Sequence, residues 1–348
     1  MQHHKKVLVL FVLCILLVVG SLFFLSKKTK DMFVATSSTM MLPTPTPVPF
    51  EDLTIPYLRK KTYDGALSEE RVRVSSTGTY TSYSTSYTSD GLKINGQLTV
   101  PIGDMPIGGW PAIVFIHGYI PPTIYQTFSN YVTYVDYLAR NDFVVFKIDL
   151  RGHADSEGQA GGAYYSSDYV VDALNAVNAL QHADFVDPSR VGLWGHSMAG
   201  NVVLRSLAVK PQIPAAVIWA GAVYTYADQR KYGIQDNSYR PPANTTPAQR
   251  RRDELFKIHG QFSKDSPFWK QVAATNYLTD IRTAIQIDHA VDDTVVNIGY
   301  SRDLDKLLTE AHVVHELKEY PSGGHNISDG NFTSAMQNTV NFFNKYLR

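Results

Sequence analysis

The chain has 348 residues, of which 44% are hydrophobic and 12% aromatic, enough for one large domain with a substantial core or for two small ones. Lys plus Arg and Asp plus Glu both number 32, so the formal net charge is zero, and this balance gives no support to nucleic-acid binding. Cys14 is the single cysteine, which excludes an intrachain disulfide and therefore a disulfide-stapled scaffold.

An uncharged apolar run occupies residues 7–25, after a short tail of residues 1–6. At a rise of ~1.5 Å per residue, a helix of this length just crosses a hydrocarbon core of ~30 Å. No small-x-small cleavage site follows the run, so we expect an uncleaved single-pass transmembrane anchor in a lipid bilayer rather than a signal peptide. Lysines flank both ends and leave the orientation open, but the short tail favours a folded part outside the cytoplasm.

Residues 26–49 are predicted to be a linker. Prolines alternate with other residues from Pro43 to Pro49, a pattern that favours an extended polyproline spacer. We therefore expect the folded domain over residues 50–348. It begins with a Thr- and Tyr-rich strand over 77–89 and a second strand over 92–100, joined by a turn at Asp90-Gly91.

Strands and helices alternate through the rest of the chain. Strands are predicted at 112–116, 143–149, 190–194, 215–220, 284–287 and 313–320, and helices at 128–140, 169–180, 201–209, 298–308 and 332–347. Repeated strand–helix units predict an α/β fold with a mostly parallel central sheet and helices on both faces. Ligands of such sheets bind at the carboxyl ends of the strands.

Residues 224–280 interrupt this alternation. The segment is polar and has helical stretches near Leu255 and Trp269. We interpret it as a cap-like insertion that covers the site, the alternative being an ordinary surface excursion. The arginine run at 250–252 is interpreted as a solvated helix face rather than an anion site.

Gly195-His196-Ser197-Met198-Ala199-Gly200 lies between the predicted strand at 190–194 and the predicted helix at 201–209. A serine in such a tight turn, among small residues, is typical of a nucleophile elbow, which lifts the hydroxyl above the sheet edge. The usual pattern is G-x-S-x-G, and Ala199 stands where the second glycine is usual. Ser197 is therefore the predicted nucleophile.

A serine hydroxyl needs a base, and the base needs an orienting acid. His325 lies in a glycine-rich loop after the last predicted strand, and Asp292 follows the strand before it. We predict Ser197 as nucleophile, His325 as general base and then acid, and Asp292 as the acid that orients His325. Asp293 is the rival for that last role.

The oxyanion of an acyl-transfer reaction needs preorganised N–H donors. We expect these to be the backbone N–H groups of Met198, directly after the nucleophile, and of Tyr119, in the loop after the strand at 112–116. His117 and His196 are interpreted as structural hydrogen-bonding residues. The histidines show no metal-ligand spacing, so neither a metal nor a cofactor is expected.

Over residues 87–348 these motifs together resemble the catalytic domain of the prolyl oligopeptidase family of serine peptidases, and related esterases, in the α/β-hydrolase superfamily. The segments that carry the resemblance are 87–96, His117-Gly118, 149–158, 187–197, Asp292-Asp293 and Gly324-His325. The chain departs from the family pattern at Asp288-His289-Ala290, where the family usually has His-Gly before the acid. No segment is long enough for the β-propeller that peptidases of the family carry.

The resemblance implies a serine hydrolase that cleaves a peptide or carboxylic ester substrate through an acyl-enzyme. The alternative is a carboxylesterase or acetyl esterase without peptidase activity. A non-catalytic binding module on the same scaffold is less favoured, because such proteins commonly lack one member of the triad and none is missing here.

Overall fold

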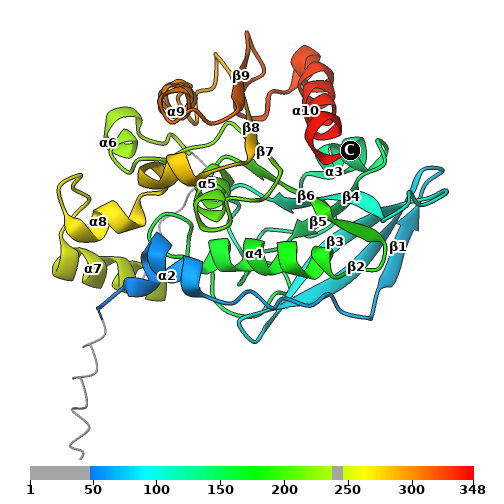
Figure 1. Ribbon diagram of the computed structural model, residues 1–348, viewed down its shortest axis with the longest axis horizontal. Helices are drawn as coiled ribbons and strands as arrows, with labels where there is room; N and C mark the ends of the chain where they lie inside the picture. The colour runs from blue at the N-terminus through cyan, green and yellow to red at the C-terminus, as the bar shows by residue number, and fades with distance from the viewer. Residues whose placement is uncertain (1–47, 237–245) are drawn as a thin grey trace, which may run out of the picture. The chain divides into compact units, whose positions relative to one another are not determined.

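The computed structural model describes residues 48–236 and 246–348. Within these residues nine strands form one sheet. The strands are β1 (Val72–Ser76), β2 (Tyr80–Ser89), β3 (Leu92–Pro101), β4 (Trp110–Ile116), β5 (Val144–Ile148), β6 (Val186–His196), β7 (Ala215–Trp219), β8 (Ala284–Ala290) and β9 (His315–Tyr320). Their order across the sheet is β1-β2-β3-β5-β4-β6-β7-β8-β9 (Figure 1).

The larger part of the sheet is parallel. Neighbouring strands run parallel from β5 through β4, β6, β7 and β8 to β9, whereas β1, β2, β3 and β5 pair antiparallel. Every residue of β4, β5, β7 and β8 is buried, as expected for parallel strands covered on both faces. The predicted mostly parallel sheet is confirmed.

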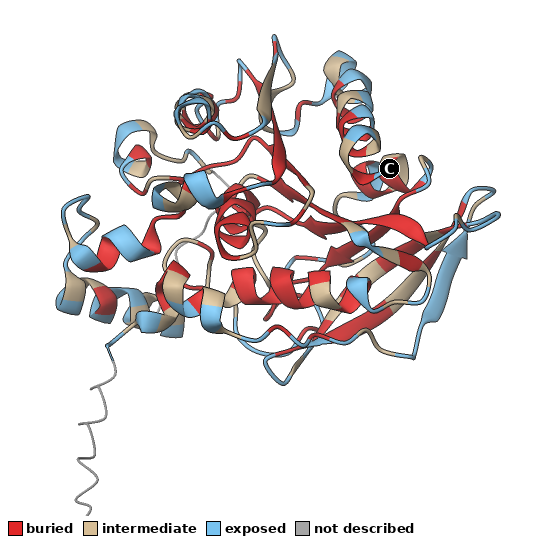
Figure 2. Ribbon diagram, in the orientation of Figure 1, coloured by how far each residue is buried: buried red, intermediate tan, exposed pale blue. Residues whose placement is uncertain are grey.

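Helices cover both faces of the sheet. The α-helices of the described residues are α2 (Ile55–Lys60), α3 (Val132–Ala139), α4 (Asp168–Gln181), α5 (Ala199–Val209), α6 (Asp228–Tyr232), α7 (Pro247–His259), α8 (Pro267–Val272), α9 (Gly299–Glu310) and α10 (Phe332–Leu347). In β4, Val114 and Ile116 pack in one apolar cluster with α4, α5 and α9, whereas Ile113 and Phe115 pack in another with α3 and α10. Successive strand side chains point to opposite faces, so the sheet separates two cores. Figure 2 colours most of the central strands and of α5 as buried.

The segment 224–280 lies between β7 and β8 and contains α6, α7 and α8. Helix α7 begins with a capping box, in which Thr246 and Gln249 exchange side-chain-to-backbone hydrogen bonds, and it ends at Gly260 with φ +70°. Leu255 of α7 and Trp269 of α8 are fully buried, in the same apolar cluster as the side chains of α5. The insertion is therefore packed onto the domain by its apolar side chains.

Some element boundaries differ from those predicted. The helix predicted from residue 128 begins at Val132, because Tyr131 has φ +62° and cannot continue a helix. Strand β1 and helix α2 were not predicted. All five residues of β1 are exposed, and α2 has only six residues, so neither has a readable hydrophobic period.

In the part of the chain that the structure describes, no helix is long and apolar enough to span a membrane. The tail at 1–6, the predicted anchor at 7–25 and the linker up to residue 47 lie outside the described residues. Residues 49–348 form one compact unit.

Candidate active site

Ser197 occupies the turn between β6 and α5 with φ +56°, a left-handed conformation that is strained for a residue with a side chain. Its N–H donates to the carbonyl oxygen of Trp219 at 2.9 Å, and its own carbonyl accepts from the N–H of Gly200 at 2.9 Å. The strained turn is thus held at both ends by the neighbouring strand and by the helix that it starts. This geometry is that of a nucleophile elbow.

Two glycines allow this turn to pack. A Cβ on Gly195 would lie 2.7 Å from Val203 Cγ2, and a Cβ on Gly200 would lie 2.7 Å from the Cα of Gly221. Ala199, between them, is fully buried and begins α5. The close approaches therefore require glycine at 195 and 200, while the position where the usual pattern has glycine accepts a methyl group.

His325 lies in the loop after β9, and its Nδ1 is 2.8 Å from Oδ2 of Asp293. This contact corrects the prediction that Asp292 orients the imidazole. Asp292 is exposed, and its carboxylate accepts the backbone N–H groups of Gly324 at 2.8 Å and Gly323 at 3.3 Å. Asp292 thus holds the backbone of the histidine loop, whereas Asp293 contacts the ring.

The reason for this division is the direction of the chain after β8. The strand ends at Ala290, and the turn that follows directs the side chain of Asp292 outward and that of Asp293 into the protein. No local pattern separates the two aspartates, because they are adjacent in the chain and have the same chemistry.

Asp293 is the most heavily hydrogen-bonded carboxylate of the site. Its Oδ1 accepts the N–H groups of Val295 at 2.8 Å and Val296 at 2.9 Å, and its Oδ2 accepts from His289 Nε2 at 3.1 Å as well as from His325. Burial alone would raise the pKa of Asp293, but the bonds from His289 and His325 outweigh it and hold the pKa well below its ordinary value. Asp293 therefore stays ionised.

His289 is a residue of the site that sequence reasoning did not identify as such. It is fully buried, and its Nε2 lies 3.1 Å from Asp293 Oδ2 and 2.9 Å from the carbonyl oxygen of Val296. Both are acceptors, so Nε2 donates to them, and Nδ1 lies 2.7 Å from the Ser301 hydroxyl oxygen. His289 therefore supports Asp293 on the side away from His325, in the segment where the chain departs from the family pattern.

His117 and His196 are both buried among hydrogen-bond partners, as expected for structural residues. His117 Nδ1 is 2.7 Å from the carbonyl oxygen of Gly118, and His196 Nε2 is 2.9 Å from that of His325. Burial is the main cause that lowers the pKa of each to about 3, so both are neutral at physiological pH.

A cavity of about 1670 Å³ opens at the carboxyl ends of the parallel strands. Ser197, His325, Tyr119 and Met198 all line it, so the structure brings the predicted nucleophile, base and oxyanion donors to one place. Met198 directly precedes α5, and Tyr119 follows β4.

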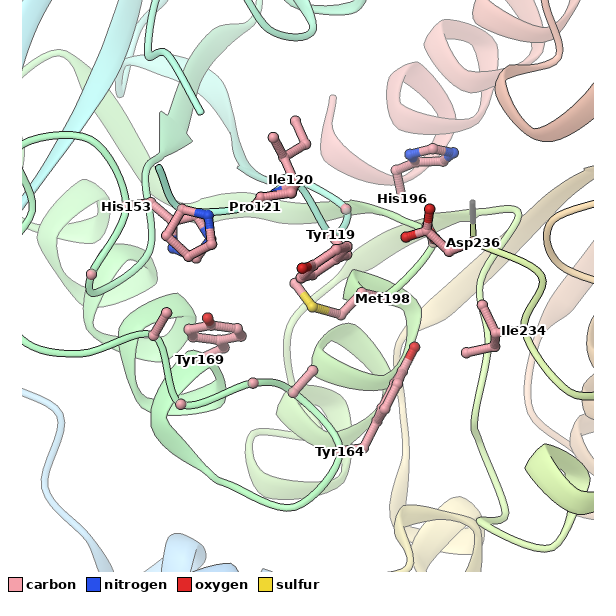
Figure 3. A pocket seen from close by; sticks show the side chains of 18 of the residues that line it. Tyr119, Ile120, Pro121, His153, Tyr164, Tyr169, His196, Met198, Ile234 and Asp236 are labelled. Carbon is pink, nitrogen blue, oxygen red and sulfur yellow. The ribbon is translucent and has the colours of Figure 1, made fainter. Parts of the chain in front are cut away.

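Aromatic and small residues form part of the cavity wall. Tyr164, Tyr169 and His153 surround the space beside Met198 in Figure 3, and residues 158–163 contribute glycine and alanine. From the insertion, Arg251 and Arg252 of α7 also line the cavity, and each pairs with a carboxylate, of Asp52 and Asp253 respectively. In the described residues, no cluster of His, Cys, Asp and Glu is arranged to hold a metal ion.

The chain was compared with families and curated proteins. The family model described as serine aminopeptidase, S33, matches residues 111–242. A serine hydrolase-like protein of Danio rerio is 30% identical over 129 residues, which are 35% of this chain and 36% of that protein. The thiohydrolase aneE of Aspergillus aculeatus is 29% identical over 34% of each chain. The chain thus aligns with about a third of the length of these relatives.

Solved structures align over a larger share of the chain. An acetyl xylan esterase of Paenibacillus sp. R4 aligns with 84% of this chain and 92% of its own, with a TM-score of 0.58 and 16% identity. The acylaminoacyl peptidase of Pyrococcus horikoshii aligns with 77% of this chain and 42% of its own, with a TM-score of 0.58 and 16% identity. At this identity the likeness concerns the fold. The chain has the α/β-hydrolase fold, in an arrangement similar to that of these esterases and peptidases.

Proposed function

We propose that this chain is a serine hydrolase that cleaves carboxylic ester or peptide bonds through Ser197, His325 and Asp293. The observation that carries the proposal is the strained Ser197 turn in one cavity with His325, whose Nδ1 contacts the buried, ionised Asp293. A neutral serine hydroxyl becomes a useful nucleophile only beside such an oriented base.

In the proposed reaction, Ser197 Oγ attacks the substrate carbonyl carbon while His325 Nε2 takes the hydroxyl proton. The C=O π electrons move onto oxygen, and the N–H groups of Tyr119 and Met198 stabilise that negative charge. His325 then gives its proton to the leaving alcohol or amine, and an acyl-enzyme remains. A water molecule then attacks the acyl carbon while His325 takes its proton. The bond to Ser197 Oγ breaks, His325 returns the proton to Oγ, and the carboxylic acid product leaves. Asp293 keeps the imidazolium oriented throughout.

A carboxylic ester is the second, narrower candidate for the substrate. It is supported by the alignment of acetyl xylan esterases from Paenibacillus and Thermoanaerobacterium over 92% and 95% of their own lengths. Peptide substrates are supported by the serine aminopeptidase model over residues 111–242. Turnover of short-chain acyl esters and of aminoacyl-arylamides, measured side by side, distinguishes the two.

Covalent labelling tests the nucleophile directly. A fluorophosphonate should label the folded wild-type protein at Ser197, and Ser197→Ala should lose both label and turnover, by orders of magnitude in rate. Folded wild-type protein without label or ester turnover would contradict the proposal and leave a non-catalytic binding module.

We also propose that residues 7–25 anchor the chain in a membrane with the hydrolase domain outside the cytoplasm. The support is the length of the uncharged apolar run.

A further inference from the structure

Three hydrogen bonds in series connect the loop after β4 to the loop that carries His325. The N–H of Gly118 donates to Tyr131 Oη at 2.9 Å, Tyr131 Oη lies 2.7 Å from His196 Nδ1, and His196 Nε2 lies 2.9 Å from the carbonyl oxygen of His325. None of these contacts involves the reacting hydroxyl. The series runs beside it, through the residue that directly precedes Ser197 in the chain.

The proton positions in this series follow from its two ends. The His325 carbonyl can only accept, so Nε2 of His196 carries the proton, and Nδ1 of the neutral ring must accept. Tyr131 therefore donates its hydroxyl proton to Nδ1, which leaves its oxygen free to accept from Gly118. Burial keeps His196 neutral by lowering its pKa to about 3, so this arrangement holds across the physiological pH range.

The side chains of Tyr131 and His196 are closely packed. A Cβ on Gly118 would lie 2.8 Å from Tyr131 Oη and 3.1 Å from His196 Nδ1. The Tyr131 ring meets the buried Phe115 ring edge-on at 5.4 Å, and the His196 ring lies 4.6 Å from that of His325. A close backbone approach and two ring contacts thus confine the Tyr131–His196 pair.

We propose that Tyr131 and His196 are positioning residues. They fix the loop after β4, which carries Tyr119, and the catalytic histidine, His325, relative to each other. Gly118 directly precedes Tyr119, the proposed oxyanion donor, so a bond to its N–H constrains where the next N–H points. His325 is held at its ring by Asp293 and at its carbonyl by His196. This inference rests on the proposed function, because it assigns a role within that reaction.

The substitution Tyr131→Phe tests the pair, because it removes the hydroxyl and keeps the ring. The N–H of Gly118 and Nδ1 of His196 then lose their partner, and both loops gain freedom. We expect kcat for a short-chain ester to fall roughly 10- to 100-fold while KM stays within about threefold, since small displacements at the reacting atoms act on the transition state. The rate of fluorophosphonate labelling should fall by the same factor.

Tyr137→Phe is the matched control. Tyr137 lies on α3, the helix that Tyr131 directly precedes, and its hydroxyl donates to Gln337 at the surface, so we expect wild-type kcat. At His196 we expect His196→Gln, which keeps an N–H donor for the His325 carbonyl, to retain more activity than His196→Leu. The double variant Tyr131→Phe/His196→Leu should lose no more kcat than the single variant with the larger loss, because both substitutions interrupt the same series of hydrogen bonds.

The outcomes separate this inference from the proposed function. If wild-type protein is labelled and turns over ester, but Tyr131→Phe keeps wild-type kcat, the positioning role is wrong. The role is also wrong if the Tyr131→Phe and His196→Leu losses add fully, or if activity falls only in proportion to the folded fraction seen in thermal unfolding. If wild-type protein is not labelled, the proposed function itself fails.

Discussion

The carboxylate of Asp293 receives hydrogen bonds from two backbone N–H groups and two imidazole rings. Asp292, its neighbour in the chain, accepts only backbone N–H groups of the histidine loop. The two residues have the same chemistry and different neighbours. In the proposed reaction, Asp293 is the carboxylate placed to stabilise the imidazolium that forms when His325 takes the proton of Ser197.

Neutralising the two aspartates should therefore have unequal effects. Asp293→Asn removes the charge and disturbs the tautomer of His325, so we expect kcat to fall about 10³- to 10⁴-fold. Asp292→Asn weakens the hold on the loop backbone, and we expect a loss of about tenfold or less. Ester turnover at pH 8 measures both, and circular dichroism checks folding. Equal losses, or a larger loss for Asp292→Asn, would refute the assignment.

The carboxyl group of Asp288 in β8 has a raised pKa, whereas that of Asp293 is lowered. Burial raises its pKa to about 7, although its oxygens face Gln286 Nε2 at 2.6 Å and Tyr320 Oη at 2.8 Å. In the unfolded chain the same carboxyl titrates near about 4. Between these two values the folded state binds more protons than the unfolded state.

The free energy of unfolding should therefore decrease as pH rises from about 4 to about 7 through this residue. Asp288→Asn, which cannot ionise, should remove that contribution, worth on the order of 2–4 kcal/mol at pH 8. Urea unfolding of the wild type and the variant at pH 5 and pH 8 measures it, because other titrating groups cancel in the difference. A difference that does not change with pH would show that Asp288 keeps its ordinary pKa.

At the scale of elements, the packing of the turn between β6 and α5 depends on which of positions 199 and 200 is alanine and which is glycine. Ala199 begins α5 in full burial, and Gly200 packs its Cα side against Gly221. The usual motif pattern treats 199 as the glycine position. In this chain the closest backbone approach falls one residue later.

Exchanging glycine and alanine at these two positions tests this packing. Ala199→Gly should keep kcat within about threefold and lower stability by only ~0.5–1 kcal/mol, the helix cost of glycine. Gly200→Ala forces its methyl group against the backbone of Gly221 and should cost about 1–3 kcal/mol, with reduced kcat. Thermal and urea unfolding compare the variants. The packing explanation fails if Ala199→Gly is the more destabilised of the two.

Strands and helices were predictable from the sequence where their buried residues form a regular apolar pattern. The parallel strands β4, β5 and β7 are continuous apolar runs, and α10 has a helical apolar stripe that gave its bounds at 332–347. Strand β1 has no buried residue and therefore no pattern. The start of α3 depends on the left-handed Tyr131, whose side chain contacts Phe115 and His196, far away in sequence.

At the scale of the whole molecule, residues 49–348 contain the complete proposed site. The cavity takes its walls from the loop after β4, the segment 152–169, the turn at Ser197, the insertion and the histidine loop. Helix α7 of the insertion forms part of the cavity wall. We therefore expect substitutions in α7 to change which substrates are preferred and to leave the reaction of the triad unchanged.

The proposed anchor gives a prediction for the full chain. Expressed whole, the protein should sediment with membranes, resist extraction by salt and alkali, and dissolve in detergent with ester turnover retained. Deletion of residues 7–25 should move the activity to the soluble fraction. A full chain that is soluble without detergent would overturn the anchor.

The sequence by itself determined the order of most strands and helices, the positions of Ser197 and His325, and the loops in which oxyanion donors are expected. These follow from local patterns: apolar period, small residues around a sharp turn, and glycines in a loop. Only the tertiary structure decided that Asp293 rather than Asp292 faces His325, that His289 supports it, and that Tyr131 bonds to His196. The reason is that side-chain direction within a turn, and contacts between distant segments, depend on how the whole chain packs and leave no period in the sequence.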